Sequence, residues 1–488
     1  MTRTTDLDTL LTDALGGRLP WRLIAAASGE TSCELTQVTD STRALAPGAL
    51  FVCVVGQRHD GHDFAAGAVE AGAAAVVVQR ALEVAVPQIV VADSRRALGL
   101  LCAAQAGWPS DRLEVVGVTG TNGKTSTAHL LGHILGHAGR QTSVRGTLTG
   151  TLTTPEAPEL QQWFAQRIAA GDRHVVMEVS SHALELQRVA GTRFSLGVFT
   201  NLGHDHLDFH GTPERYFAAK ASLFTPEYCT AAVINRDDVH GRLLADVTAV
   251  PVTTFGLDDI SDVRVDRLEH QYRWRGQLVT VPLGGEFHVM NSLASATAAA
   301  VLGVDEAVVA EALAVAPTVR GRFEVIDHED GPTVVVDFAH TPEGLEQVLR
   351  AARRLTGAGR LIVVFGCGGD RDAPKRPRMG AVAAGLADTV ILTSDNPRSE
   401  DPLAIMEAIR RGVDEVDPAR LGVMEPDRRR AIAAALETAT SGDVVIVAGK
   451  GHENTQTIGD LVVPFDDATV VAELLDAHLA QRSPEVAL

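Results

Sequence analysis

The sequence predicts an α/β protein of about three domains, each with a largely parallel sheet. Its 488 residues are more than one hydrophobic core usually serves. Short apolar runs alternate with stretches of helical periodicity along the chain, and strands that alternate with helices pair in parallel. Most of the apolar runs end in polar residues, and parallel strands bring such ends to the sheet edge where α/β proteins bind ligands.

Two interruptions indicate the domain boundaries. The polar turn at 107–110 closes an N-terminal block that contains predicted strands at 50–52 and 75–78, and Pro317 closes a second block. Both later blocks repeat the theme of a strand followed by a polar cluster. We therefore predict domains at 1–108, 109–318 and 319–488.

The composition excludes several classes of protein. The net charge of −19 argues against a general nucleic-acid surface, which needs a basic face. No apolar run is long enough to span a bilayer, so we expect no membrane span and a location in the cytoplasm. The five cysteines are far apart and form no CxxC pair or Cys/His cluster, so we interpret them as reduced packing residues.

The clearest motif is a phosphate-binding loop. An apolar strand at 115–118 leads into TGTNGKTS at 119–126, and helical periodicity follows. In such a loop the backbone N–H groups and the helix N-terminus cradle phosphates, Lys124 meets the β- and γ-phosphates, and Thr125 reaches Mg²⁺. Val118 stands where the general pattern has a glycine, which leaves open a glycine-rich turn with a chance Lys-Thr.

Two further residues of the second block are candidate metal ligands. Glu178 follows the apolar strand at 174–177, and a carboxylate there can hold Mg²⁺ directly or through water. His206 lies in a polar cluster that follows the next predicted strand, and it could serve a metal or a phosphate. The alternatives are a solvated glutamate and a structural histidine.

Lys220 lies in the middle of an apolar helical stripe formed by Tyr216, Phe217, Leu223 and Phe224. An ammonium there is costly unless it snorkels, pairs or loses its charge. One alternative is a snorkelling lysine. The other is a desolvated amine that reacts with CO₂ to give a carbamate, which would be an anionic metal ligand.

In the third block Arg371, Arg398 and Glu453 each follow a separate predicted strand. Arginine binds a carboxylate in a bidentate manner and glutamate accepts hydrogen bonds from an ammonium, so the three together indicate a pocket for an amino acid. The run RRR at 428–430 indicates instead a solvated helix face.

Eight motifs connect the sequence to one family. They are, in chain order, TGTNGKT at 119–125, TTPE at 153–156, MEVSSH at 177–182, TNLGHDHLD at 200–208, DFAHTP at 337–342, GCGGDRD at 366–372, DNPR at 395–398 and GKGHE at 449–453. With them, nearly the whole chain resembles the Mur ligases, and within that family the branch that adds diaminopimelate. The family's phosphate loop also lacks the outer glycine, so Val118 fits the resemblance.

The resemblance implies a central P-loop ATPase domain with a parallel sheet, flanked by a smaller N-terminal α/β domain for the UDP end and a Rossmann-like C-terminal domain. It implies an ATP-dependent ligase of cytoplasmic peptidoglycan precursor synthesis. ATP phosphorylates the D-glutamate carboxylate of UDP-N-acetylmuramoyl-L-alanyl-D-glutamate, and the amine of meso-diaminopimelate displaces phosphate. The implied cofactors are ATP and Mg²⁺, with CO₂ for lysine carbamylation. We expect a monomer that acts on these small molecules.

The family's site residues match positions of this sequence motif by motif. Candidate catalytic residues are Lys124, Lys220, Glu178 and His206; Thr125, Glu178, His206 and Lys220 would serve the metal, Lys220 as N6-carboxylysine. ATP contacts are Gly120, Thr121, Asn122, Gly123, Lys124, Thr125, Ser126, Asn291, Arg322 and Asp337, the last three at adenine and ribose. The muramoyl dipeptide matches Ser41, Thr42, Arg43, Thr153, Thr154, Ser180 and Arg188, and diaminopimelate matches Arg371, Asp395, Asn396, Arg398, Gly449 and Glu453.

Three alternatives stay open. Two are relatives, the L-lysine-adding sister ligase and folylpolyglutamate synthase, and the third is a P-loop NTPase that uses hydrolysis as a switch or motor. The sequence has no guanine-binding Asn-Lys-x-Asp motif, and such an NTPase would leave the third block without a role. Two departures from the family concern substrate contacts: STR at 41–43 stands for Asp-Ser-Arg near the uridine, and the segment 146–154 is short.

Overall fold

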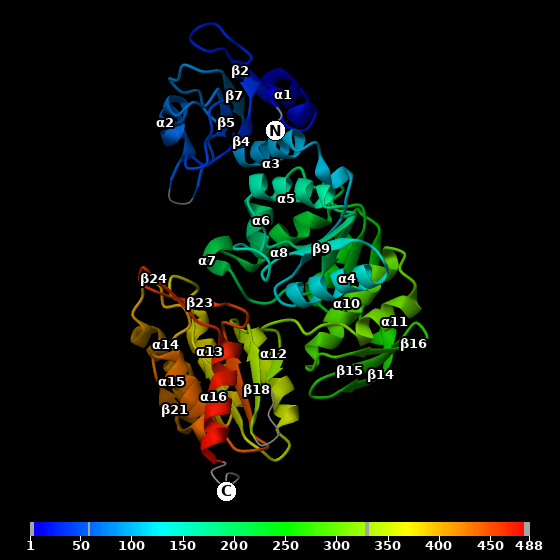
Figure 1. Ribbon diagram of the computed structural model, residues 1–488, viewed down its shortest axis with the longest axis vertical. Helices are drawn as coiled ribbons and strands as arrows, with labels where there is room; N and C mark the ends of the chain where they lie inside the picture. Colours follow the sequence, from blue (N-terminus) through cyan, green and yellow to red (C-terminus); the bar gives the residue numbers. More distant parts are fainter. Residues whose placement is uncertain (1–3, 57–58, 327–330, 483–488) are drawn as a thin grey trace.

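The computed structural model describes residues 4–56, 59–326 and 331–482, which form three α/β units along the long axis of the molecule (Figure 1). Each unit has its own sheet and its own hydrophobic core. The predicted α/β class with largely parallel sheets is confirmed. Among the described residues, no helix combines the length and the apolar character that crossing a bilayer requires.

The N-terminal unit is a five-stranded sheet between two layers of helices. The strand order is β2 (Trp21–Ile24), β7 (Gln88–Val91), β6 (Ala75–Val78), β5 (Ala49–Val52) and β4 (Gln37–Thr39). Only β2 pairs antiparallel, with β7. Helices α1 (Leu7–Leu15) and α3 (Ser94–Gln105) cover one face, and α2 (Ala65–Glu70) covers the other.

The central unit is a six-stranded, fully parallel sheet in which β8, the strand before the phosphate loop, lies between β11 and β10. The order is β13 (Val252–Phe255), β12 (Ala232–Asn235), β11 (Leu196–Phe199), β8 (Glu114–Thr119), β10 (His174–Glu178) and β9 (Thr142–Arg145). Successive residues of β8 face opposite layers. Val116 and Val118 pack under α4 (Lys124–His137) and α10 (Phe287–Val301), whereas Val115 packs with α5 (Ala157–Ala169).

A second, antiparallel sheet of the central unit was not predicted from the sequence. It consists of β14 (Ile260–Val265), β15 (His270–Trp274) and β16 (Gln277–Val281). Its inward side chains, Tyr272 and Trp274, extend the core formed by α4, α10 and α11 (Glu306–Ala314). The remaining helices of this unit are α6 (Ser181–Glu185), α7 (Leu207–His210), α8 (Pro213–Ala221) and α9 (Val239–Val247).

The C-terminal unit is a six-stranded sheet that is parallel except at one edge. The order is β17 (Glu324–Ile326), β18 (Thr333–Asp337), β22 (Val444–Ala448), β19 (Leu361–Phe365), β20 (Thr389–Leu392) and β21 (Leu421–Met424), with β17 antiparallel. The helices are α12 (Pro342–Leu355), α13 (Lys375–Leu386), α14 (Pro402–Val416), α15 (Arg428–Thr438) and α16 (Asp467–Arg482). A hairpin of β23 (Thr455–Ile458) and β24 (Leu461–Pro464) follows β22.

The prediction of a solvated helix face at 428–430 is wrong for its first residue. Arg428 is fully buried, and its Nε and Nη2 donate to the two carboxylate oxygens of Asp467 at 2.8 and 2.7 Å. Its Nη2 also donates to the carbonyl of Ala448 at 3.0 Å. Arg429 and Arg430 are exposed, as predicted. The difference arises because the first turn of α15 faces α16, a contact between segments that are distant in the sequence.

We predict that Arg428→Leu destabilises the C-terminal unit strongly. The substitution leaves the Asp467 carboxylate buried without its partner, and breaking a buried pair in this way costs about 3–5 kcal/mol. Arg429→Leu is the matched control, because it removes an exposed pair with Glu473 that contributes at most about 1 kcal/mol. Denaturant unfolding followed by circular dichroism measures both free energies, and equal effects of the two substitutions would contradict the prediction.

Candidate active site

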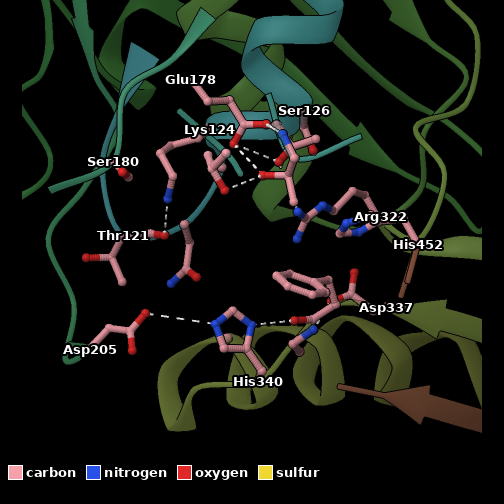
Figure 2. Close-up of a pocket in the computed structure, with 18 of the residues that line it drawn as sticks. Thr121, Lys124, Ser126, Glu178, Ser180, Asp205, Arg322, Asp337, His340 and His452 are labelled. Carbon is pink, nitrogen blue, oxygen red and sulfur yellow. Dashed lines mark hydrogen bonds and ion pairs between the residues drawn. The ribbon is translucent and has the colours of Figure 1, made fainter. Parts of the chain in front are cut away.

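One cavity of about 1210 Å³ lies between the central and C-terminal units. The carboxyl ends of β8, β10, β11 and β12 contribute its central wall, and the loops after β18, β19, β20 and β22 contribute the opposite wall. The polar clusters that the sequence places after these strands therefore meet in one space. Figure 2 shows part of this space, with residues of the central unit facing residues of the C-terminal unit.

The phosphate loop connects β8 to α4, as predicted. Gly120 and Gly123 adopt φ angles of 151° and 83°, which favour glycine. A Cβ at Gly120 would lie 1.9 Å from Oγ1 of Thr200, and one at Gly123 would lie 2.3 Å from Oδ1 of Asn291, so both positions also need glycine for space. Lys124 begins α4, and its ammonium donates to the carbonyls of Gly120 and Thr121, at 2.9 Å each.

Thr125 and Glu178 form the candidate Mg²⁺ site. The Thr125 hydroxyl donates to Oε2 of Glu178 at 3.0 Å, and Glu178 also accepts from the backbone N–H of Thr147 at 2.8 Å. Glu178 is almost fully buried. These two hard oxygen donors beside a phosphate loop fit Mg²⁺ that shares its coordination with nucleotide phosphates. Within the described ranges, no three His, Cys, Asp or Glu side chains gather as a complete metal cage.

Lys220 lies behind the phosphate loop rather than in the cavity wall. It is on α8, almost fully buried, and its ammonium donates to the carbonyl of Gly120 at 2.8 Å. Burial, reinforced by the charge of Lys124, lowers the pKa of the Lys220 amine well below its usual value. The lysine in the apolar stripe predicted from the sequence is therefore desolvated and does not snorkel to the surface.

His206 lines the cavity at the start of α7, with a left-handed φ of 55°. Its Nε2 is 3.3 Å from Oδ2 of Asp205, and its ring meets the ring of His182 edge-on. Burial lowers the pKa of His206 to about 3, against the attraction of Asp205. The imidazole is therefore neutral at physiological pH, the form in which histidine binds metals.

The predicted nucleotide contacts converge on the same cavity. Asn291, Arg322 and Asp337 all line it. Arg322 donates to Oγ1 of Thr125 at 2.9 Å and lies over the ring of Phe338, so its guanidinium stands beside the phosphate loop. Asp337 accepts from the backbone N–H of Phe323 at 2.7 Å, and burial raises the pKa of its carboxyl to about 6.

The predicted amino-acid pocket is also assembled here: Arg371, Asp395, Asn396, Arg398, Gly449 and Glu453 all line the cavity. Arg398 has a φ of 51° after Pro397, and its Nη1 donates to the carbonyl of Gly369 at 2.7 Å. Burial and the neighbouring charge of Arg371 lower the pKa of Arg398. Two guanidiniums thus share one region, and an anionic group would relieve their repulsion.

Not every predicted residue reaches the cavity. Thr153 and Ser180 line it, whereas Thr154 and Arg188 lie beneath: the hydroxyl of Thr154 donates to the carbonyl of Glu178, and Arg188 pairs with Glu156 at 2.8 Å. Ser41, Thr42 and Arg43 follow β4 in the N-terminal unit, outside this cavity.

Many residues that line the cavity were not predicted from the sequence, and three of them carry ionisable groups close to the boundary between the units. His340 and Lys375 come from the C-terminal unit, and Asp205 comes from the central unit. Nε2 of His340 lies 3.9 Å from Oδ2 of Asp205, so the pair bridges the two units (Figure 2). His340 and Asp205 lie in the quoted motifs, but a motif does not say which of its members faces the space between two domains.

Comparison with known proteins places this architecture in a family. Three family models match the chain: "Mur ligase family, catalytic domain" at 34–106, "Mur ligase middle domain" at 118–299 and "Mur ligase, glutamate ligase domain" at 321–451. The UDP-N-acetylmuramoyl-L-alanyl-D-glutamate–2,6-diaminopimelate ligase of Syntrophomonas wolfei is 42% identical over 475 residues, which are 93% of this chain and 97% of that protein. The chain belongs to the Mur ligase family. The protein of the same name from Streptomyces avermitilis is also 42% identical, over 93% of this chain and 94% of its own length.

Solved structures agree with this Mur ligase assignment. A diaminopimelate ligase structure is 34% identical with a TM-score of 0.63, and the match covers 91% of this chain and 95% of that one. The MurF ligase from Thermotoga maritima in complex with ADP has the same TM-score at 21% identity, over 92% of this chain and 98% of that one, which supports the fold alone. As a Mur ligase, this protein is an ATP-dependent enzyme that forms a peptide bond in peptidoglycan precursor synthesis.

We predict that the KM for ATP rises as the pH falls through about 6. The carboxyl of Asp337 has a raised pKa, so it becomes protonated in this range and loses acceptor capacity for a ribose hydroxyl. Initial rates with the other substrates saturating measure the effect. Asp337→Asn is the control, because its KM should be higher at neutral pH and lack this pH dependence. The same pH dependence in the variant would contradict the assignment.

Proposed function

We propose that this Mur ligase joins meso-diaminopimelate to the D-glutamate carboxylate of UDP-N-acetylmuramoyl-L-alanyl-D-glutamate, with cleavage of ATP to ADP and phosphate. The observation that carries the proposal is the single cavity in which a phosphate loop faces a pocket with two arginines and a glutamate. The names of relatives about 42% identical support the same reaction.

The chemistry has two steps. The D-glutamate carboxylate attacks the γ-phosphorus and the bond to the β-phosphate oxygen breaks, which gives an acyl phosphate and ADP. The amine of diaminopimelate then attacks the acyl carbon, the bond from that carbon to the phosphate oxygen breaks, and the nitrogen loses a proton. Lys124 would leave the loop carbonyls to stabilise charge on the transferred phosphoryl group. Thr125, Glu178 and His206 would hold Mg²⁺, which neutralises phosphate charge when bound.

Lys220 would complete this site as a carbamate. Its amine is buried and has a lowered pKa, so a neutral nitrogen is available to attack CO₂. The nitrogen forms a new bond to the CO₂ carbon, one C=O π bond opens onto oxygen, and the nitrogen loses one proton, so the neutral amine becomes an anionic carbamate. The nitrogens of Lys124 and Lys220 donate to the same carbonyl, that of Gly120, so an anion on Lys220 would lie close to the ammonium of Lys124 and balance its charge.

The proposal also covers the domain boundaries, the binding of the UDP end of the substrate and the location of the enzyme. We assign the domains as 1–108, 109–318 and 319–488, and the UDP end of the substrate to Ser41, Thr42 and Arg43 of the N-terminal domain. Thr153 and Ser180 would contact the muramoyl dipeptide between the loop and that domain. The enzyme would act in the cytoplasm as a monomer on small molecules, without nucleic acid.

The lysine-adding sister ligase is the nearest rival. Diaminopimelate differs from lysine by a second carboxylate at the far end, and Arg371 and Arg398 offer two guanidiniums for such a group. Lysine would leave these guanidiniums without an anionic partner, and at Arg398 this costs more than a lost contact because burial partly desolvates that group. Diaminopimelate is therefore the better fit.

We predict strong discrimination between these two amino acids. Rejection of a substrate that lacks a required polar group can reach ~10⁴-fold in kcat/KM. Arg398→Ala should lose most activity with diaminopimelate and most of the preference, whereas Arg350→Ala, at an exposed ion pair on α12, should change neither. Rates of ADP release with each amino acid and the UDP-dipeptide measure this. Equal use of lysine and diaminopimelate by the unaltered enzyme would refute the proposed substrate.

We also predict that Lys220→Ala loses ligase activity, by roughly 10²–10³-fold as for other electrostatic groups, and that acetate or propionate partly restores it. A small carboxylate can fill the gap and replace the carbamate charge. Lys124→Ala is the control: it should lose a similar amount, but a carboxylate should not restore it, because a positive charge is missing there. Absence of rescue at Lys220, or equal rescue of both variants, would contradict carbamylation.

A further inference from the structure

Lysine is rare in this chain, and each lysine lies at the cavity or directly behind its wall. Only four of the 43 basic side chains are lysines: Lys124, Lys220, Lys375 and Lys450. Arginine fills the other basic positions, including nearly all surface ion pairs. A chain that otherwise uses arginine keeps lysine where a compact ammonium is needed. Lys124 and Lys220 have roles above, whereas Lys450 has none.

Each N–H donor of the Lys450 ammonium has a hydrogen-bond acceptor close to it. Its side chain has no exposed surface. An ammonium has three N–H donors, and Nζ lies 2.9 Å from Oε2 of Glu453, 2.7 Å from the carbonyl of Thr455 and 3.4 Å from Oδ1 of Asn396. The planar fork of arginine would not reach three acceptors arranged around one point.

Glu453 is consequently held by one of its two oxygens. Oε2 accepts from Lys450 and also from Nδ2 of Asn396 at 2.8 Å. Oε1 accepts no hydrogen bond from the residues that the structure describes, and Glu453 lines the cavity. Oε2 of Glu453 is thus held by protein groups, and Oε1 is available to a ligand.

The neighbouring arginines show why this restraint matters. Glu453 is close enough to Arg398 to interact with its charge. A freely rotating Glu453 would pair with that guanidinium and neutralise the group that should bind the substrate's carboxylate. Lys450 and Asn396 hold the Glu453 carboxylate in place and so prevent it from pairing with Arg398. The amide of Asn396 is itself fully engaged, since Oδ1 also accepts from the backbone N–H of Thr457 at 2.9 Å.

We propose that Lys450 is a positioning residue for the distal ammonium of diaminopimelate. By fixing Oε2 of Glu453, it presents Oε1 to that ammonium while Arg398 stays free for the distal carboxylate. The inference rests on the proposed function, because it assumes that diaminopimelate occupies this pocket. Asn396 contributes to the same restraint through the hydrogen bond from its Nδ2 to Oε2 of Glu453.

The test compares diaminopimelate with 2-aminopimelate, which keeps the distal carboxylate but lacks the distal amine. In Lys450→Met, kcat/KM for diaminopimelate should fall by roughly 10–100-fold, the usual loss for a charged hydrogen bond. The value for 2-aminopimelate should fall clearly less, because this analogue can lose only the contact of its carboxylate with Arg398 and has no distal amine to lose from Glu453. The KM for ATP should change by less than about threefold, because ATP binding does not depend on Glu453. Lys450→Arg should behave like Lys450→Met, since arginine cannot meet the three acceptors.

A second pair of variants separates positioning from folding. Glu453→Gln should lower the same ratio, and the double variant Lys450→Met/Glu453→Gln should discriminate no worse than Glu453→Gln alone. The double variant also removes both charges, so it folds even if the unpaired Glu453 of the single variant does not. The matched control is Gln456→Leu, which loses the bond from Gln456 to the carbonyl of Asp395 (2.6 Å) in the same hairpin and should affect both amino acids equally.

The outcomes are distinct. If Lys450→Met reduces both amino acids equally, as Gln456→Leu does, or if Lys450→Arg restores the preference, Lys450 is merely structural and the inference fails. If the unaltered enzyme uses 2-aminopimelate as well as diaminopimelate, Glu453 does not read the distal amine and the inference also fails. If the unaltered enzyme does not add diaminopimelate at all, the proposed function fails instead.

Discussion

The side-chain nitrogens of two lysines meet at a single backbone oxygen, the carbonyl of Gly120, and the active site depends on this contact. Lys124 reaches it from α4 at 2.9 Å and Lys220 reaches it from α8 at 2.8 Å. Burial, reinforced by the charge of Lys124, lowers the pKa of the Lys220 amine. An incoming phosphate, and a carbamate on Lys220, would each reduce the positive charge there. The charge at the phosphate loop therefore favours the binding of anions.

The second constraint is the position of strand ends. Parallel strands deliver polar residues to one edge, and here two sheets from different units turn those edges toward each other across one cavity. The central sheet supplies Glu178 and the phosphate loop, and the C-terminal sheet supplies Asp337 and the amino-acid pocket. Contacts such as Arg322 with Thr125 and His340 with Asp205 connect the two walls. The residues proposed for the nucleotide come from both units and those proposed for the amino acid come from the C-terminal unit, so the proposed site is complete only when the two walls face each other.

Much of the fold and of the site follows from local sequence pattern. The strands at 50–52, 75–78 and 174–177 were predicted because buried parallel strands are continuous apolar runs, and the structure confirms them. The antiparallel strands β14 to β16 were missed because none is a continuous apolar run: β14 is mostly exposed, and in β15 and β16 buried residues alternate with less buried ones. Residues with a motif, such as Lys124, Glu178 and Arg398, line the cavity as predicted.

The sequence by itself determined the α/β class and the strand, loop and helix of the phosphate loop, because these depend on spacing within one segment. Only the tertiary structure decided which polar residues face a ligand and which face each other. Arg428 and Arg429 are neighbours in a run of identical residues, yet one is buried against Asp467 and the other is exposed. Glu453 and Asn396 are 57 residues apart, and only folding gives one oxygen of Glu453 to Lys450 and Asn396 and leaves the other available. The physical reason is that burial and pairing depend on contacts between distant segments, which local periodicity does not encode.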